Sequence, residues 1–392
     1  MIGVNKTGNE SRSALSNDDN GAVEIAGAGP AGLAAAITLA RAGRSVIVHE
    51  ARAEVGYRFK RDLQGLENWS TRQDALAVLQ ELGITTGFKR VPCRRGTAFD
   101  AWDVPYAIQS GEPLFYLVER GSGPDTLDTA LLQQARDLGV AVHFKSPLRH
   151  ARGQAILATG PKAADAIAVG YHFDTPMPDG FWAICDDSLA PKGYAYLLVM
   201  GGKGTVKSCM FTDFKNEARY VERTVDAFQR LVGMWMVNPT PHGGVGNFRI
   251  PGTALSGTHP VIGEQAGFQD TLWGFGMREA ITSGVLAARS LLHGGDYDRL
   301  WRESLGRPMA AAMVNRALYS LLGNRGYRWC MRRQENHLDA REFLHRRYRP
   351  TLTRRLLVPL ARLHFRSQRR DESCNHVDCS CIWCRHGREL HT

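Results

Sequence analysis

A glycine motif between two short apolar runs constrains the fold of this chain more than any other feature. The motif G-x-G-x-x-G follows the mainly apolar run Val-Glu-Ile-Ala at residues 23–26, and a second run, Ser-Val-Ile-Val at residues 45–48, comes shortly before Glu50. This order predicts a strand, a helix and a parallel strand that bind a dinucleotide, because the glycines let a pyrophosphate approach the helix and the acid accepts hydrogen bonds from a ribose. The motif residues expected to form this site are Gly27, Gly29, Pro30, Ala31 and Gly32.

The length and composition indicate a globular protein of two or three domains. The chain has 392 residues, of which 43% are hydrophobic and 22% are charged, and these values exclude a disordered or fibrous chain. No run approaches the ~18 apolar residues that a membrane-spanning helix needs. Residues 1–20 are polar, lack the blocks of a signal peptide and are expected to form a flexible arm. We therefore expect a cytoplasmic protein.

Beyond the first motif, the pattern of apolar residues changes along the chain. Amphipathic helices are predicted at residues 74–82 and 125–138, and an apolar strand follows the second helix at residues 140–144. From residue 171 to about residue 214, aromatic and β-branched runs alternate with turn residues, which predicts an antiparallel sheet. Glycines at residues 243–246 predict a flexible loop. The chain is thus expected to be an α/β protein with an inserted sheet.

Three further segments carry patterns found together in one enzyme family. Residues 116–120 read Tyr-Leu-Val-Glu-Arg, residues 155–160 end in Ala-Thr-Gly, and residues 262–268 contain Gly-Glu-Gln-Ala-Gly ahead of the glycine-rich residues 274–278. Together with the first motif, these segments resemble the glutathione-reductase-type FAD-dependent oxidoreductases. The resemblance is to the group of geranylgeranyl reductases, p-hydroxybenzoate hydroxylase and flavin-dependent halogenases, and it covers roughly residues 22–290.

The resemblance implies a domain organisation. An FAD-binding, Rossmann-like domain is expected over residues 21–170 and 245–295, and an antiparallel substrate-binding sheet over residues 171–244 is inserted into it. A basic helical region at 296–370 and a cysteine-rich tail at 371–392 follow.

The resemblance also implies FAD contacts. Arg120 is expected to reach the ribityl or phosphate part of FAD, and Glu264 to bind the ribityl hydroxyls, although most relatives have Asp at that position and Pro in place of Thr271. Backbone amides at the helix start near Gly276 would stabilise the negative charge of a reduced flavin. Arg58 is expected to contact the flavin or the substrate. The expected contacts outside the first motif are Glu50, Arg58, Arg120, Gly160, Glu264, Gly274, Gly276 and Met277.

A segment of the expected sheet resembles the geranylgeranyl reductases in particular. Residues 191–196 read Pro-Lys-Gly-Tyr-Ala-Tyr, where relatives have Pro-x-Gly-Tyr-x-Trp. The resemblance implies an aromatic pocket for an apolar substrate, although these side chains are equally suited to an ordinary sheet core. We therefore expect reduction of a carbon–carbon double bond in an apolar substrate, for which isoprenoids and lipids are candidates. The pocket residues are expected to be Phe181, Trp182, Tyr194 and Tyr196.

Two other functions fit the same cofactor site. One is an FAD-dependent monooxygenase that hydroxylates its substrate, and the other is a flavin-bearing electron-transfer protein that binds a redox partner. The sequence has no second strand-associated glycine motif, so the electrons would come from transiently bound NAD(P)H or from a protein donor. No proton donor can be named from the sequence.

The eight cysteines fall into two groups. Four are scattered and are expected to be small buried residues, whereas four lie within eleven residues near the end of the chain. Four thiolates at this density predict a metal site, and both zinc and an iron–sulfur cluster are candidates. The expected ligands are Cys374, Cys379, Cys381 and Cys384.

Positive charge is concentrated towards the end of the chain. The formal net charge is +10, and arginines crowd residues 299–370. Charge alone does not choose among an anionic lipid surface, an acidic protein and nucleic acid, of which nucleic acid is the least expected. Residues 351–365 place leucines near one helical face beside arginines. This pattern suits peripheral contact with a membrane, but it also suits a basic helix packed on its own domain.

Overall fold

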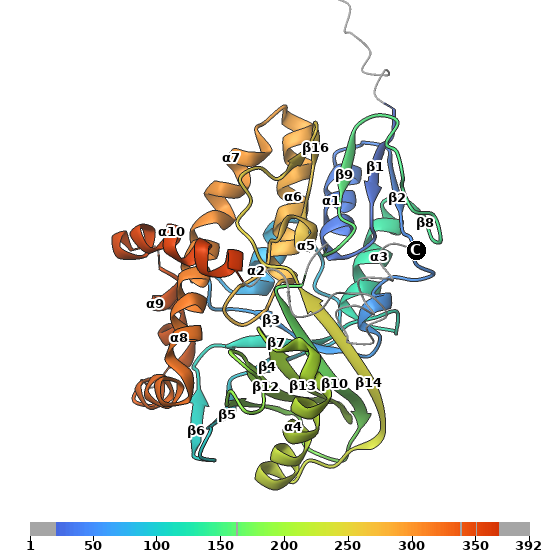
Figure 1. Cartoon of the computed structure of the whole chain (residues 1–392). Helices are drawn as coiled ribbons and strands as arrows, with labels where there is room; N and C mark the ends of the chain where they lie inside the picture. The colour runs from blue at the N-terminus through green and yellow to red at the C-terminus, as the bar shows by residue number, and fades with distance from the viewer. Residues whose placement is uncertain (1–20, 162–163, 338, 350, 368–392) are drawn as a thin grey trace, which may run out of the picture.

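The computed structural model describes residues 21–161, 164–337, 339–349 and 351–367. The predicted arm at residues 1–20 and the four cysteines of the predicted metal site lie outside the described residues. In Figure 1, a parallel sheet with its helices forms the upper part of the molecule, a larger sheet forms the lower part, and the last helices lie at one side.

The first β-α-β unit forms as the glycine motif predicts. Strand β1 spans Val23–Ala26, helix α1 spans Pro30–Arg41, and strand β2 spans Val46–His49 parallel to β1. Pro30 occupies the first turn of α1, where its fixed φ angle suits a helix and its missing N–H costs nothing. The flanking strands β9 (Ala155–Leu157) and β8 (Ala141–His143) complete the sheet in the order β8-β2-β1-β9.

Helices cover this parallel sheet. Helix α6 (Met277–His293) packs against α1 so closely that a Cβ atom added at Gly284 would lie 2.1 Å from the carbonyl oxygen of Ala31. Helix α3 (Leu127–Asp137) also packs against α1. The short elements β15 (Leu255–Ser256), β16 (His259–Pro260) and α5 (Gly263–Ala266) lead into α6.

The second part of the molecule is a seven-stranded sheet. Helix α4 (Glu217–Val232) packs on one face of this sheet, against β10 and β13. The sheet is larger than the predicted segment 171–244, because β5 and β6 from earlier in the chain extend its edge. The strands, in order across the sheet, are β14 (Val237–Gly246), β10 (Ala166–Asp174), β13 (Lys203–Met210), β12 (Tyr194–Met200), β11 (Gly180–Cys185), β5 (Arg95–Asp100) and β6 (Pro105–Gln109).

The expected loop at residues 243–246 is wrong, because these glycines belong to β14. They pair with β10 from Ala166↔Gly246 to Val169↔Gly243. Glycine is unfavourable in a strand unless another group approaches closely, and a Cβ atom at Gly246 would lie 2.7 Å from the ring of Phe248.

A small sheet connects the two parts. It consists of β3 (Leu63–Glu67), β7 (Phe115–Glu119) and β4 (Arg90–Cys93), in the order β3-β7-β4. A short turn of helix, η1 (Tyr57–Phe59), leads into β3, and helix α2 (Ala75–Glu81) follows β3. The amide of Leu63 donates to Thr205 Oγ1 of β13 at 3.1 Å, so the start of β3 is held against the larger sheet.

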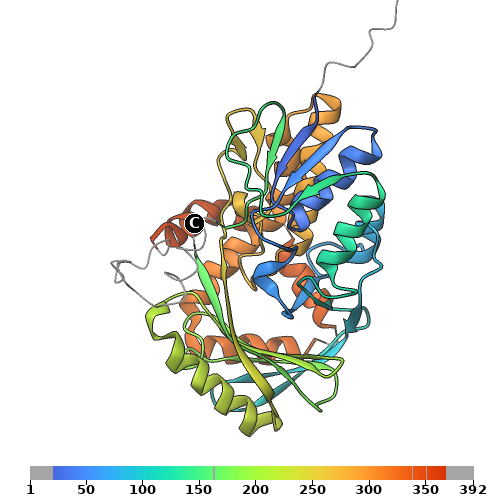
Figure 2. The same cartoon turned by 90° about the vertical axis from the view of Figure 1, so that its right-hand side faces the viewer.

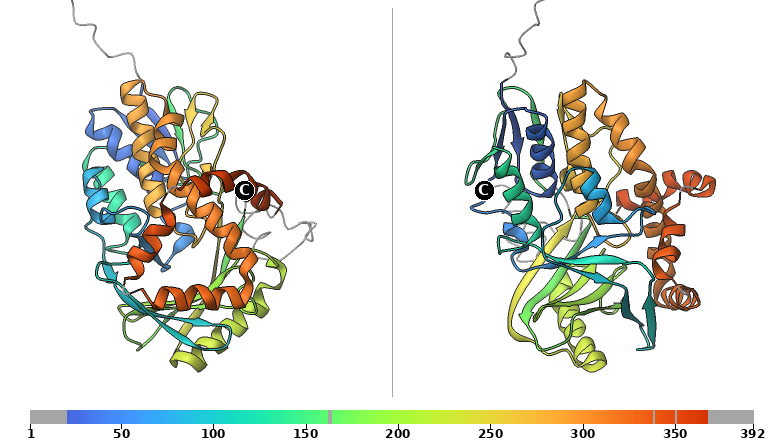
Figure 3. Two further views of the ribbon diagram at one scale, coloured as in Figure 1. Left: turned by 90° about the vertical axis from the view of Figure 1, so that its left-hand side faces the viewer. Right: turned by 180° about the vertical axis from the view of Figure 1, so that it is seen from behind.

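The basic region is helical, as predicted. After α7 (Tyr297–Trp301) comes α8 (Arg307–Glu335), which is broken at Gly323, where φ is 58°. The second half of α8 crosses near β5, β6 and β11 (Figure 2). Helices α9 (Ala340–Tyr348) and α10 (Leu352–Ser367) follow, and the right view in Figure 3 shows them grouped with α8 at one side. Within the described residues, no helix is long and apolar enough to cross a membrane.

Candidate functional site

One cavity of about 1660 Å³ is lined by both halves of the molecule. Its volume exceeds the ~300–1,000 Å³ that is typical of a small-molecule site. The cavity therefore has room for a dinucleotide and a second molecule. Nearly all of the predicted cofactor residues line it: Gly27, Gly29, Pro30, Ala31, Glu50, Arg58, Arg120, Gly160, Glu264, Gly274, Gly276 and Met277.

The three motif glycines have different roles. A Cβ atom at Gly27 would lie 2.3 Å from the carbonyl oxygen of Ala158, and one at Gly32 would lie 2.0 Å from the carbonyl oxygen of Gly27. Gly32 does not line the cavity, so its role is close packing. A Cβ atom at Gly29 would meet no atom within 4 Å. Gly29 thus leaves an open cradle at the N-terminus of α1, which suits a pyrophosphate.

Glu50 lies next to this cradle. Its Oε2 accepts a hydrogen bond from the amide of Ala28 at 2.8 Å, and its Oε1 accepts one from the amide of Arg52 at 2.9 Å. The turn after β1 and the turn after β2 therefore hold the carboxylate at the end of the parallel sheet. This is the place where a dinucleotide fold presents an acid to a ribose.

Polar atoms without partners line the middle of the cavity. Arg58 Nη2 and Gln269 Oε1 are buried and have no hydrogen-bond partner within the part of the chain that the structure describes. Arg58 Nη1 lies 3.7 Å from Glu264 Oε2, and burial raises the pKa of Glu264 while Arg58 opposes that shift. Buried polar atoms in native proteins normally have partners, so these atoms fit a polar ligand in the cavity. The arginine donor suits a phosphate, and the acceptor oxygens of Gln269 and Glu264 suit the ribityl hydroxyls of FAD.

Arg120 lines the cavity but is already bonded on several sides. Its Nε and Nη2 donate to the two carboxylate oxygens of Asp128 at 2.8 and 2.9 Å, and its Nη1 donates to Gln64 Oε1 at 2.9 Å. These bonds hold α3 and β3 together beneath the cavity. A direct contact between Arg120 and a flavin remains a prediction.

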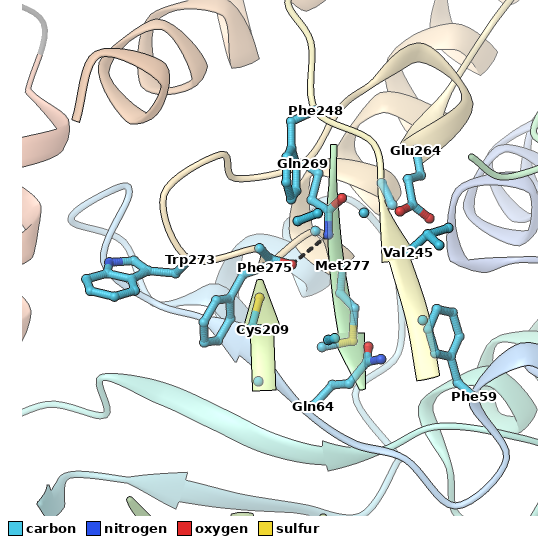
Figure 4. A pocket seen from close by; sticks show the side chains of 18 of the residues that line it. Phe59, Gln64, Cys209, Val245, Phe248, Glu264, Gln269, Trp273, Phe275 and Met277 are labelled. Carbon is cyan, nitrogen blue, oxygen red and sulfur yellow. Dashed lines mark hydrogen bonds between the residues drawn. The ribbon is translucent and has the colours of Figure 1, made fainter. Parts of the chain in front are cut away.

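The N-terminus of α6 faces the same cavity. Gly276 caps the helix and Met277 is its first residue, and both line the cavity. Gln269 Nε2 donates to the carbonyl of Gly274 at 2.6 Å and so fixes the preceding turn. Figure 4 shows Gln269, Met277 and Gln64 around the space that Cys209 and Val245 border from the sheet. The positive end of the helix dipole is therefore available to an anionic ring.

A buried charge cluster, which no sequence motif indicates, borders the cavity. Lys207 Nζ donates to Asp62 Oδ1 at 2.6 Å, and His172 Nε2 lies 3.0 Å from the same oxygen. Although burial opposes ionisation, Lys207 and His172 lower the pKa of Asp62 below its usual value. His242 stacks on His172 with 4.1 Å between ring centroids, and burial together with Lys207 lowers the pKa of His242 to about 3. No local pattern links these residues, because they lie on four separate segments.

The other end of the cavity is aromatic. All four predicted pocket residues line it, together with Trp273, Phe275 and Tyr319. Phe181, Tyr194 and Tyr196 pack with the cluster on the cavity face of the sheet. Trp182 packs mainly with the cluster beneath α4 on the opposite face, because successive strand residues alternate in direction. Tyr194 donates its hydroxyl hydrogen to the carbonyl of Trp273, which positions both rings.

The scattered cysteines are mainly buried, as predicted. Cys93, Cys185 and Cys209 are buried and Cys330 is partly so. Burial raises the pKa of the Cys209 thiol, which lines the cavity, to about 12. Cys209 is therefore a neutral, weakly polar part of the wall at ordinary pH.

Comparisons with known proteins bear on the fold. A family model described as an NAD(P)-binding Rossmann-like domain matches residues 25–65. No curated protein matches the chain. Among solved structures, a geranylgeranyl bacteriochlorophyll reductase-like protein from Thermoplasma acidophilum is similar, with a TM-score of 0.66 and 17% identity over 88% of this chain and 98% of that protein.

Two further structures share the arrangement. The flavin-dependent brominase Bmp2 has a TM-score of 0.59 and 15% identity over 88% of this chain and 98% of its own. The p-nitrophenol 4-monooxygenase PnpA from Pseudomonas putida has a TM-score of 0.59 and 13% identity over 83% of this chain and 96% of its own. At such low identities the likeness shows the fold, and it confirms the predicted Rossmann-like domain with its additional sheet and C-terminal helices.

Proposed function

We propose that this chain, which has the fold of the FAD-dependent oxidoreductases, reduces a carbon–carbon double bond in an apolar, isoprenoid-like lipid. The observation that carries the proposal is the continuity of one cavity. It runs from the glycine cradle and Glu50 to the aromatic wall of the seven-stranded sheet. A cofactor that extends from the cradle would thus meet a second molecule held against apolar side chains.

The residues of the cradle and of the central cavity would hold FAD. The N-terminus of α1 would bind the pyrophosphate, Glu50 the adenosine ribose, and Glu264 with Arg58 the ribityl chain. The amides at Gly276 and Met277 would stabilise negative charge on the ring. When bound and reduced by an external electron donor, FAD would supply the hydride for the reduction, and a proton from water or a side chain would complete the addition across the double bond.

The aromatic end favours an apolar substrate. Phe181, Tyr194, Tyr196, Trp273 and Phe275 present rings to the cavity. Burial holds the pKa of Tyr194 and of Tyr196 well above its usual value, so both phenols stay neutral. A neutral, apolar wall would exclude water and orient an alkene beside the cofactor ring.

An anaerobic turnover experiment tests this reaction against hydroxylation. The protein is loaded with FAD, reduced chemically and mixed with a polyprenyl lipid in the absence of oxygen. Reduction predicts that the flavin reoxidises and that the lipid gains a pair of hydrogen atoms, as mass spectrometry would detect. A hydroxylase would leave the lipid unchanged until oxygen is admitted, and its product would then contain an added oxygen atom. In an electron-transfer protein, a protein acceptor would reoxidise the flavin, and neither the lipid nor oxygen would serve as a substrate.

A further inference from the structure

Helix α10 turns its leucines away from the protein. Leu356 and Leu360 are 78% and 64% exposed, and they lie on one face of the helix with two further exposed leucines, Leu352 and Leu363. The other face packs on α8, where Ala361 is buried against Met313 and Val314. A helix on a protein surface normally buries its apolar stripe and exposes its polar face. In α10 the leucine stripe is left without a partner among the described residues.

A second exposed apolar group lies at the break in α8. Leu321 is 74% exposed, and Leu318, Leu322 and Trp329 are also exposed. These same four side chains line the large cavity. The cavity therefore opens to the surface beside Gly323, at an apolar rim. Figures 1 and 3 show α8 and α10 at the same side of the molecule.

Positive charge accompanies the apolar residues. Arg355 and Arg362 of α10 are exposed beside the leucines, and α10 contains no acidic residue. Arg354 is partly exposed and donates to the carbonyl of Arg349 at 2.7 Å. Exposed leucines next to arginines are the pattern of a helix that lies in the interface of an anionic membrane.

We propose that the leucine surface, formed by the exposed apolar residues of α8 and α10, docks on an anionic lipid bilayer. The charges favour this occupant over a second copy of the chain, because pairing two such surfaces would bring arginines together. A bilayer instead offers acyl chains to the leucines and phosphate groups to the arginines. The docking does not depend on the proposed reaction. Passage of a lipid substrate from the bilayer into the cavity beside Gly323 does rest on the proposed reaction.

Vesicle flotation with the full chain tests the docking. Wild-type protein is mixed with vesicles of phosphatidylcholine alone and with vesicles that also contain phosphatidylglycerol. The variant L356E/L360E places two charges in the leucine surface, and W235E serves as the matched control, because Trp235 is 64% exposed and lies in the segment that follows α4. We expect wild type and W235E to bind the anionic vesicles, and L356E/L360E to bind them at least about tenfold more weakly.

Three other outcomes would overturn the proposal. In the first, wild-type protein binds neither kind of vesicle. In the second, L356E/L360E and wild type bind the vesicles equally. In the third, wild type forms a concentration-dependent dimer in sedimentation experiments, and L356E/L360E abolishes this dimer. The last would assign the surface to a second copy of the chain. Circular dichroism and the FAD content of each variant are measured in parallel. Vesicle binding and these two readouts do not require turnover. Failure of the proposed reaction can therefore be told apart from failure of the docking.

Discussion

Lys207 and Asp62 form a buried ion pair between the seven-stranded sheet and the segment that enters β3. Lys207 Nζ lies 2.6 Å from Asp62 Oδ1, and at most 2% of either side chain is exposed. The pair lines the cavity and lies beside His172. It therefore links the part of the molecule that holds the glycine motif to the part that presents the aromatic wall.

Removal of the lysine from this pair should destabilise the protein. In Lys207→Met, Asp62 remains buried without its ammonium partner, while Gln64 Nε2 at 2.8 Å and His172 Nε2 at 3.0 Å stay within hydrogen-bond distance of its carboxylate. A buried charge that loses its partner typically costs about 3–5 kcal/mol. We expect a loss near the lower end of that range in urea denaturation, because these two hydrogen-bond contacts to Asp62 remain. The double variant K207M/D62L removes both charges and should recover much of the loss. Equal stability of K207M and wild type would contradict the importance of the pair.

Substitution of Gly29 should remove the cofactor without unfolding the chain. A side chain at Gly29 enters open space in the cradle, so Gly29→Val should fold normally but bind FAD at least about a hundredfold more weakly. Gly32→Val should instead unfold the domain, because its Cβ would lie 2.0 Å from the carbonyl oxygen of Gly27. Gly87→Val is the control, since Gly87 is exposed, lies outside the cavity lining and has open space for a Cβ. Flavin fluorescence titration and thermal unfolding measure the two effects. Tight FAD binding by Gly29→Val would contradict the assignment of the cradle.

Asp270 should make stability depend on pH. Burial raises its pKa from 3.8 to about 7, while a hydrogen bond from Tyr348 and the amide of Trp273 oppose the shift. Between these two values the folded protein holds a proton that the unfolded chain has released. The free energy of unfolding should therefore fall as the pH rises from about 4 to about 7, by at most ~1.4 kcal/mol per pH unit from this group.

The variant Asp270→Asn isolates this contribution. Asn mimics the protonated carboxyl, because its oxygen can accept from the amide of Trp273 while its amide donates to Tyr348. The difference in unfolding free energy between wild type and variant should thus change with pH across this window and become constant above it. Urea denaturation at several pH values provides the measurement. Parallel stability curves for the two proteins would show that Asp270 ionises normally.

Alanine variants of Phe181 and Trp182 should distinguish a role in substrate binding from a role in packing. Phe181 faces the cavity, whereas Trp182 packs with the cluster beneath α4. Phe181→Ala should raise KM for an apolar substrate by about tenfold, since one ring is worth about 1–3 kcal/mol of apolar contact. Trp182→Ala should mainly lower stability and raise KM less than Phe181→Ala does, because Trp182 lines the cavity but packs mainly with the cluster beneath α4. Equal effects of the two variants on KM would place the substrate elsewhere.

The sequence predicted the parts of the fold that depend on local patterns. The strand Val23–Ala26 and the helix Pro30–Arg41 follow from the glycine spacing and from the apolar runs on either side. The cavity-lining positions of Glu50, Glu264 and Gly276 follow from motifs that short stretches of chain contain in full. Such motifs can be read because their geometry is set within a few residues.

The remaining features depend on contacts between distant segments. The cluster of Asp62, His172 and Lys207 forms only because the turn after η1 meets β10 and β13. Strand β5 joins the larger sheet by pairing with β11, and β6 pairs with β5 at the edge. No alternation pattern within residues 95–109 indicates the pairing with β11. In β14, pairing with β10 overrides the weak strand propensity of glycine.

The flavin content of the purified protein tests the assigned cofactor site most directly. Protein that has been incubated with FAD, freed of unbound cofactor and examined by visible absorption should carry close to one FAD per chain, and Gly29→Val should carry almost none. A folded wild-type protein that retains no flavin and gains no thermal stability from added FAD would contradict the assignment of the cavity.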